Sequence, residues 1–199
     1  MSIRQTSEGP AIGASGQAHD GRVPISWLSA SLCILAVNGF VVLYLWVMGR
    51  PFVAPHEPFQ LFSASLSQGD NSLHLSDPYS LSHAIFGMGL FLFIDWMKPH
   101  WFFGRKLLVA ILGSAFWEVV ENTPFVVDLF NDPAQGDVYR GDSIVNSLSD
   151  TLFVALGFVF ASRVRWPVVV AVAVVLEIVV SLWIHDGLIL GTLKVLGLQ

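Results

Sequence analysis

Five apolar runs, each close to the length that crosses a bilayer as an α-helix, divide this chain. They lie at 25–48, 80–97, 107–127, 142–162 and 167–186. A helix needs about 20 apolar residues to span the hydrocarbon core, because each residue advances it by about 1.5 Å. Only 13% of the residues are charged, whereas soluble domains carry roughly 25%. We therefore expect an all-α, polytopic transmembrane bundle of about five spans, forming a single domain over residues 25–199.

The segments outside these runs complete the predicted outline. Residues 1–24 are rich in glycine and serine and lack hydrophobic periodicity, so we expect a disordered cytoplasmic tail. Residues 49–79 contain four prolines and predict a polar loop, although 59–66 could lie flat on the membrane surface. Pro124 should kink or end the third helix. A weaker apolar segment at 188–198 leaves a six-span or re-entrant variant open.

Basic residues give the predicted orientation, because the short cytoplasmic loops of membrane proteins carry an excess of Lys and Arg. If the N-terminus is inside, only three of the ten basic residues fall on the outer side: Arg50, Arg140 and Lys194. The other seven are then inside. We therefore expect a multi-pass protein with a cytoplasmic N-terminus and, after five spans, a C-terminus outside.

Charge and cysteine content exclude several classes of partner and site. The net charge is −5 and no basic patch is present, so no nucleic-acid partner is expected and the bilayer is the predicted partner. The oligomeric state is left open. Cys33 is the single cysteine, which excludes an intrachain disulfide and a cysteine-based metal site.

Polar and ionisable residues interrupt the apolar runs at nine positions. These are His83, Glu118, Glu121, Asn122, Asp142, Asn146, Asp150, Glu177 and His185. An ionisable group near the centre of a span costs ~2.5–3.5 kcal/mol on insertion scales, so such groups usually face a cavity or one another. In the predicted orientation almost all nine fall in the outer half of the bilayer. A common polar site is therefore expected there.

Helical spacing supports this convergence. Glu118, Glu121 and Asn122 are spaced i, i+3 and i+4, which places them on one helix face. The sets 142, 146, 150 and 177, 181, 185 each repeat at four residues and also share a face. Gly87 and Gly89 would let a neighbouring helix approach the second run closely.

Three kinds of chemistry fit a cluster of carboxylates, imidazoles and amides. One is a site for Zn, Mn, Mg or Fe, although no recognised metal motif such as His-Glu-x-x-His is present. Another is metal-free acid–base chemistry, in which close carboxyl groups of Glu118 and Glu121 share a proton with His83 as partner. The third is a structural network that only fixes helix register.

These alternatives assign candidate roles. Glu118, Glu121 and His83 are the candidate catalytic residues, with Glu118 and Glu121 acting as general base or as metal ligands. The candidate substrate-binding residues are Asn122, Asn146 and Arg140, and the candidate metal ligands are Asp142 and Asp150. A capping role competes at Asp142, because an Asp-Ser pair at a helix start makes a good N-cap. A divalent metal ion is the cofactor that the first alternative implies, and the residues leave its presence open.

Part of this pattern is similar to known families. The matching elements are Asp77 with His83, Glu118-Val-Val-Glu121-Asn122, and Asp142-Ser-Ile-Val-Asn146 with Gly157 beyond. The chain resembles an uncharacterised family of small bacterial inner-membrane proteins. Over about residues 77–161 it also distantly resembles the VanZ-like family, named for a role in teicoplanin resistance. It departs from the VanZ-like pattern at Pro78, where a lysine is usual, and at Glu121, where a glutamine is usual. The resemblance implies a bacterial plasma membrane and an envelope-related role, but no particular reaction.

The leading hypothesis is an enzyme or binding protein for a lipid-linked envelope component, with its site in the outer half of the bilayer. The alternative is a non-enzymatic membrane protein, either an ion or proton conductor or a structural helper. A conductor should need polar groups through both leaflets, and the inner half of this chain is nearly all apolar.

Overall fold

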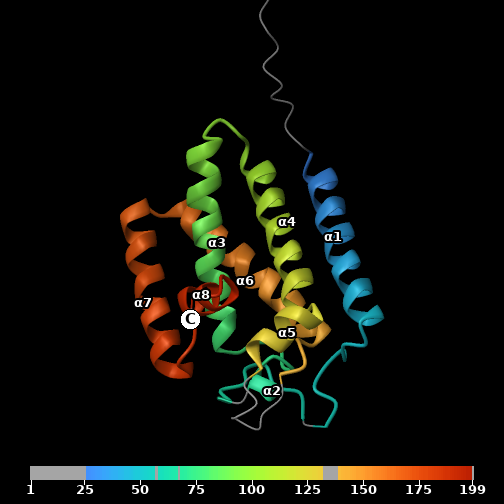
Figure 1. Ribbon diagram of the computed structural model, residues 1–199. Coiled ribbons are helices and arrows are strands. Elements are labelled where there is room, and N and C mark those ends of the chain that lie inside the picture. The colour runs from blue at the N-terminus through green and yellow to red at the C-terminus, as the bar shows by residue number, and fades with distance from the viewer. Residues whose placement is uncertain (1–25, 57, 67, 132–138, 199) are drawn as a thin grey trace, which may run out of the picture.

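The computed structural model describes residues 26–56, 58–66, 68–131 and 139–198. Within those ranges the chain forms eight helices and no strand (Figure 1). They are α1 (Trp27–Val47), α2 (Gln68–Asn71), α3 (Pro78–Met97), α4 (Phe103–Glu121), α5 (Pro124–Phe130), α6 (Ile144–Arg163), α7 (Trp166–Ile184) and α8 (Leu188–Val195). The all-α prediction is confirmed. The tail predicted for 1–24 lies outside the described residues.

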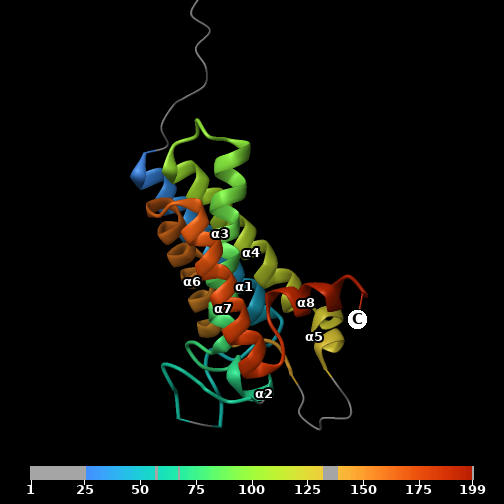
Figure 2. The same cartoon turned by 90° about the vertical axis from the view of Figure 1, so that its left-hand side faces the viewer.

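Four of these helices, α1, α3, α6 and α7, are long and apolar enough to cross a membrane. α4 has a similar length of 19 residues, with Arg105 and Lys106 near its start and Glu118 and Glu121 near its end. It runs beside α1 and α3 in both views and also packs against α6 (Figures 1 and 2). The predicted polytopic helical bundle is therefore confirmed, with α4 as its least apolar long helix.

The predicted break at Pro124 divides the run 107–127 into two helices. α4 ends at Glu121, and α5 begins at Pro124 after the Thr123 hydroxyl accepts a hydrogen bond from the Val126 N–H at 3.4 Å. Proline suits this first position because the N–H that it lacks would have no helical partner there. The short α5 turns away from the line of α4 (Figure 2).

Two segments left open by the sequence are now placed. Residues 59–66 form no helix, and the Ser63 N–H donates to the Ser76 carbonyl at 2.9 Å, which ties this stretch to the residues before α3. Part of the weak apolar segment 188–198 forms α8. This helix lies across the bundle and not along it (Figure 2).

α3 and α6 approach each other more closely than side chains larger than glycine allow. A Cβ atom on Gly87 would lie 2.0 Å from the Val154 carbonyl oxygen, and one on Gly157 would lie 2.0 Å from the Ala84 carbonyl oxygen. Both distances are far inside van der Waals contact, so each position requires glycine. The close approach expected at Gly87 is present, whereas Gly89 faces open space.

The two ends of the bundle differ in character. Toward the end that carries the α3–α4 connection, the interior is filled by two apolar clusters: Met88, Ala161 and Val169, and Ile94, Ala110 and Phe158. At the opposite end, the segment between α1 and α3 folds over the helix ends (Figure 1). There the carbonyls of Pro51 and Phe52 accept hydrogen bonds from the N–H groups of Ile144 and Val145 at 2.9 and 3.1 Å. This loop therefore satisfies N–H groups that the first turn of α6 leaves unpaired.

Candidate functional site

Three helices bring one imidazole and three carboxyl groups together at the loop end of the bundle. His83 of α3 places Nδ1 3.8 Å from Oε1 of Glu118 on α4, and Nε2 3.8 Å from Oδ2 of Asp150 on α6. Ligand-type atoms of His83, Glu118 and Glu121 all lie within 4.8 Å of one another. We call these four residues the His83 cluster. Polar stripes that the sequence placed on separate helices thus meet in space.

The start of α3 holds Asp150 in place. Asp77 caps the helix by accepting hydrogen bonds from the N–H groups of Tyr79 and Ser80 at 2.7 and 3.2 Å. The Ser80 hydroxyl donates in turn to Oδ1 of Asp150 at 2.9 Å. Burial, together with the charge of Asp142, raises the pKa of Asp77 from 3.8 to about 7, although its backbone N–H partners lower it. The cluster is therefore bordered by a further carboxyl group that titrates near neutral pH.

Asn122 and Asp142 form a reciprocal pair beside the cluster. Nδ2 of Asn122 donates to Oδ2 of Asp142 at 2.7 Å, and the Asp142 N–H donates to Oδ1 of Asn122 at 2.9 Å. The Tyr139 hydroxyl donates to the other Asp142 oxygen at 2.8 Å, and Nη2 of Arg50 donates to the Asn122 carbonyl at 2.9 Å. Burial raises the pKa of Asp142, while the hydrogen bonds from Tyr139 and Asn122 and the charge of Arg50 lower it. Both Asp142 oxygens thus already have protein partners.

The residue that caps α6 is Ser143 and not Asp142, for which a capping role was also considered. The Ser143 hydroxyl accepts from the Asn146 N–H at 3.1 Å and begins α6. Nδ2 of Asn146 donates to the carbonyl of buried His74 at 3.1 Å. Asn146 therefore fastens the loop to α6 and also lines the polar cavity described next.

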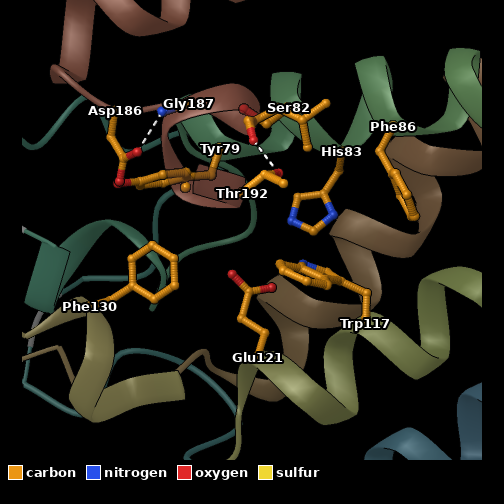
Figure 3. Close-up of a pocket in the computed structure, with 12 residues that line it drawn as sticks. Tyr79, Ser82, His83, Phe86, Trp117, Glu121, Phe130, Asp186, Gly187 and Thr192 are labelled. Atoms are coloured by element: carbon orange, nitrogen blue, oxygen red, sulfur yellow. Dashed lines mark hydrogen bonds between the residues drawn. The ribbon is translucent and has the colours of Figure 1, made fainter. Parts of the chain in front are cut away.

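A pocket of about 300 Å³ opens onto the His83 cluster between α3, α4, α5 and α8 (Figure 3). His83 and Glu121 point into it from two sides (Figure 3). Its apolar wall includes Phe86, Trp117, Phe130 and Leu188. A smaller cavity of about 40 Å³ is also lined by His83 and Glu121, together with Asp142, Asn146 and Asp150. The site therefore joins an apolar pocket to an acidic inner cavity.

α8 closes one side of this pocket and is held by two acids outside the cluster. The Tyr79 hydroxyl donates to Oδ2 of Asp186 at 3.2 Å, and Oδ1 of Asp186 accepts from the Gly187 N–H at 2.7 Å. Oε1 of Glu177 accepts from the Ile189 N–H at 2.8 Å. The structure thus places Glu177 at the start of α8, where it supports the pocket wall and does not join the cluster.

The cluster contains buried polar atoms that lack hydrogen-bond partners. Both carboxylate oxygens of Glu118 are buried and have no hydrogen-bond partner within the described part of the chain. The buried Ser147 hydroxyl, which lies near Glu118, also makes no hydrogen bond within these residues. Leaving such atoms unpaired costs about 1–3 kcal/mol each and more when they are charged, so they point to a ligand or a proton.

The structure brings together seven of the nine polar positions and leaves two outside. Glu177 holds α8, and His185 is an exposed residue with φ of 56° at the end of α7. Arg140, the candidate substrate-binding cation, is exposed, and its role stays a prediction. Arg50 instead reaches Asn122, a contact that no spacing rule in the sequence indicated. The contribution of Tyr139 was also missed, because this residue belongs to a segment between the long runs.

The chain is similar in sequence to a family of bacterial proteins. A family model described as "Protein of unknown function (DUF2585)" matches residues 45–198. A UPF0314 protein from Sphingopyxis alaskensis is 33% identical over 171 residues, which cover 86% of this chain and 89% of that protein. A UPF0314 protein from Rhizobium meliloti is 36% identical over 185 residues, covering 92% of this chain and 91% of that protein. One from Agrobacterium fabrum is 35% identical over 171 residues, covering 84% and 83%. No solved structure shows a significant match.

Proposed function

We propose a function for this chain, which belongs to the DUF2585 family of proteins of unknown function, from its buried site. In this proposal, the chain is a multi-pass protein of the bacterial plasma membrane that binds a lipid-linked envelope component. The polar end of that ligand lies against the His83 cluster, in the outer half of the bilayer, where the cluster can act on it as an acid and base.

The observation that carries this proposal is the union of the apolar pocket with the acidic cavity. His83 and Glu121 line both spaces, so a ligand in the pocket touches aromatic walls and the cluster at once. An apolar pocket with a few convergent polar groups is the usual form of a small-molecule site. An amphiphile with an apolar chain and a polar end matches the two halves.

The proposed orientation rests on the distribution of basic residues. Lys98, Arg105 and Lys106 lie at or beside the α3–α4 connection, and Arg163 and Arg165 border the α6–α7 connection. In Figure 1 the α3–α4 connection and the loop before α3 stand at opposite ends of the bundle. An excess of Lys and Arg marks the cytoplasmic side. The loop, the cluster and the pocket mouth then face the outer leaflet.

The geometry supports distinct roles within the site. Glu121 and His83 reach the pocket directly and are the proposed acid–base pair, with Glu118 behind them. Asn122, Asn146 and Arg140 are retained as proposed ligand-positioning residues, although Asn122 and Asn146 also hold the local structure. The distant VanZ-like resemblance supports an envelope-related ligand and carries no reaction.

The alternative from a different class is a polar network that only fixes helix packing. The reciprocal Asn122–Asp142 pair favours it locally, since both groups satisfy each other. The unpartnered oxygens of Glu118 count against it for the cluster, because a network kept for packing should be satisfied. A scaffold should tolerate Glu118→Gln with stability and phenotype intact. A conductor is disfavoured by the apolar clusters that fill the other half of the described bundle.

The test is recovery of a bound amphiphile. The protein is purified in a mild detergent, and its extracted lipids are compared by mass spectrometry with those of Gly191→Trp, which fills the pocket from α8. Gly39→Trp, at a lipid-facing position of α1 with open space around it, is the matched control. We expect one class of lipid-linked component to be enriched in the wild type and in Gly39→Trp and lost from Gly191→Trp. Equal recovery from all three proteins, or bulk phospholipid alone in the wild type, would contradict the proposal.

A further inference from the structure

We propose that His83, Glu118 and Glu121 bind one divalent transition-metal ion, with Asp150 positioning the His83 ring. This inference deepens the proposed function, because it concerns the same site and rests on that site for its ligand. Among the residues considered from the sequence, it keeps Glu118 and Glu121 as metal ligands, adds His83, and removes Asp142 and Asp150 from the ligand set.

The spacing of the donor atoms suits a single ion. Ligand-type atoms of His83, Glu118 and Glu121 lie within 4.8 Å of one another. Nitrogen and carboxylate ligands bind zinc at about 2.0–2.2 Å, so two ligands of one ion can be at most about 4.4 Å apart. Side-chain movements of a few tenths of an ångström close that difference. The three side chains come from two helices of the bundle interior, a common place for such sites.

The unpaired carboxylate of Glu118 is a second and independent observation in favour of a metal ion. Glu118 is fully buried, and neither of its carboxylate oxygens has a hydrogen-bond partner among the described residues. One oxygen faces His83 Nδ1 at 3.8 Å, which is too long for a hydrogen bond but leaves room for an ion between the two atoms. Within the described residues, Lys106 is paired with Asp95 and Arg50 donates to the Asn122 carbonyl, so neither of these cations neutralises Glu118.

The two nitrogens of His83 face different partners in the manner of a metal-bound imidazole. Nδ1 faces Glu118, and Nε2 faces Oδ2 of Asp150 at 3.8 Å. Histidines that bind metals usually donate their second ring N–H to a carboxylate or carbonyl, which fixes the ring orientation. Asp150 is itself held by the Ser80 hydroxyl at 2.9 Å. Ser80 therefore holds Asp150 where a shift of about 1 Å would let it accept a hydrogen bond from Nε2 and fix the ring.

Asp142 is a poor metal ligand by the same reasoning. Its two oxygens already accept hydrogen bonds from Asn122 and Tyr139 at 2.7 and 2.8 Å. Binding an ion would require breaking at least one of these buried contacts. The Glu118 oxygens, by contrast, accept no hydrogen bond from the described residues and are free to bind an ion.

The donor set selects the class of ion. Imidazole suits Zn²⁺, Fe²⁺ and related first-row ions, whereas Mg²⁺ and Ca²⁺ prefer oxygen ligands alone. Two carboxylates with one neutral imidazole also balance the charge of a divalent cation inside the bundle. Because His83 and Glu121 line the pocket, an ion that they hold would be open to the polar end of the proposed ligand. The ion would supply Lewis-acid chemistry at that point.

The experiment measures metal content and affinity in the detergent-solubilised full-length protein, purified without a polyhistidine tag. Inductively coupled plasma mass spectrometry reports bound metal, and titration of chelator-treated protein with ZnCl₂, MnCl₂ and MgCl₂ gives Kd. We expect one Zn²⁺ or Mn²⁺ per chain, with weaker binding of Mg²⁺. The Glu118→Gln, Glu121→Gln double variant should lose it, and Asp150→Asn should weaken it by about 10–100-fold. Asp128→Asn removes an exposed carboxyl group of α5 that has no part in the cluster and should keep full metal content.

A spectroscopic readout keeps the proposal testable if the double variant does not fold. Mn²⁺ bound to the wild type should show hyperfine coupling to an imidazole nitrogen in pulsed electron paramagnetic resonance, and His83→Gln should lack it. No metal in the loaded wild type, or no nitrogen coupling, would overturn the metal site. Amphiphile extraction from the same preparations separates the two proposals. If amphiphile is found without metal, only the metal site is overturned. If metal is found without amphiphile, only the lipid-linked ligand is overturned.

Discussion

Replacing Gly157 with alanine should push α3 and α6 apart where they carry the site. The new Cβ would lie 2.0 Å from the Ala84 carbonyl oxygen, and ordinary contact begins at 3.4 Å, so the helices must separate locally by about 1.4 Å. His83 adjoins Ala84, and its Nε2 lies 3.8 Å from Asp150 on α6. That separation would grow toward about 5 Å, because packed interiors transmit such strain.

The energetic cost follows from overpacking. Inserting a methyl group into a close-packed contact costs about 1–3 kcal/mol, against a gain of up to about 1 kcal/mol from the higher helix propensity of alanine. The contact at 2.0 Å belongs in the upper part of that range, so the net cost is about 1–2 kcal/mol. At about 2–4 °C per kcal/mol for a chain of this size, the Tm should fall by about 2–8 °C. Thermal unfolding in detergent, followed by tryptophan fluorescence, measures this shift. The metal affinity or amphiphile content of the same sample should fall as well.

Gly89→Ala is the matched control for this experiment. Gly89 lies on α3, two residues beyond Gly87, and a Cβ there meets nothing within 4 Å. Its variant should keep or slightly raise the Tm and retain the ligand. If Gly157→Ala behaves like Gly89→Ala in both measurements, the close helix crossing does not position the site, and the reasoning is refuted.

Three further predictions concern residues around the cluster. The wild type should lose stability as the pH rises from 3.8 to about 7, because in that range the folded protein holds a proton on Asp77 that the unfolded chain releases. Asp77→Asn should reduce this loss. Asparagine keeps the helix cap, so a comparison of Tm against pH for the two proteins isolates this group. Arg50→Gln should lower the free energy of unfolding by about 1–3 kcal/mol, because it removes the charged donor to the buried Asn122 carbonyl, and an unchanged denaturation midpoint would contradict that role. Glu177→Ala should speed hydrogen exchange at the Ile189 N–H without changing exchange in α1, as mass spectrometry of the corresponding peptides would show, and equal exchange in α8 would mean that Glu177 does not hold this helix.

The helical frame was predictable because its signals are local in the sequence. Long apolar runs specify spanning helices, and the proline at 124 ends α4 through chemistry that operates within one turn. Residues one turn apart, such as Glu118 and Glu121, share a face wherever a helix forms. The meeting of His83 with Glu118 and Asp150 followed from these stripes, since buried ionisable groups need partners inside a bilayer.

The remainder of the site depends on contacts that spacing does not encode. Arg50 and Arg140 both lie outside the long runs, and only the path of the loops decides that Arg50 reaches Asn122. Glu177 shares a helix face with His185, yet the reversal of the chain after α7 turns its carboxylate toward the Ile189 N–H. The segment before α3 read as a polar loop, although its residues Asn71 and His74 are buried over the site.

The measurement that tests the central claim most directly is photo-crosslinking in living cells. A photoreactive benzoylphenylalanine replaces Phe130, which lines both cavities, and in a matched strain it replaces Phe125, which lies on the same short helix but is 74% exposed. Mass spectrometry then identifies the molecules attached to each position. The account predicts that Phe130 captures one lipid-linked envelope component, whereas Phe125 captures bulk phospholipid or nothing. The same adducts at both positions, or none at Phe130, would contradict a ligand pocket above the His83 cluster.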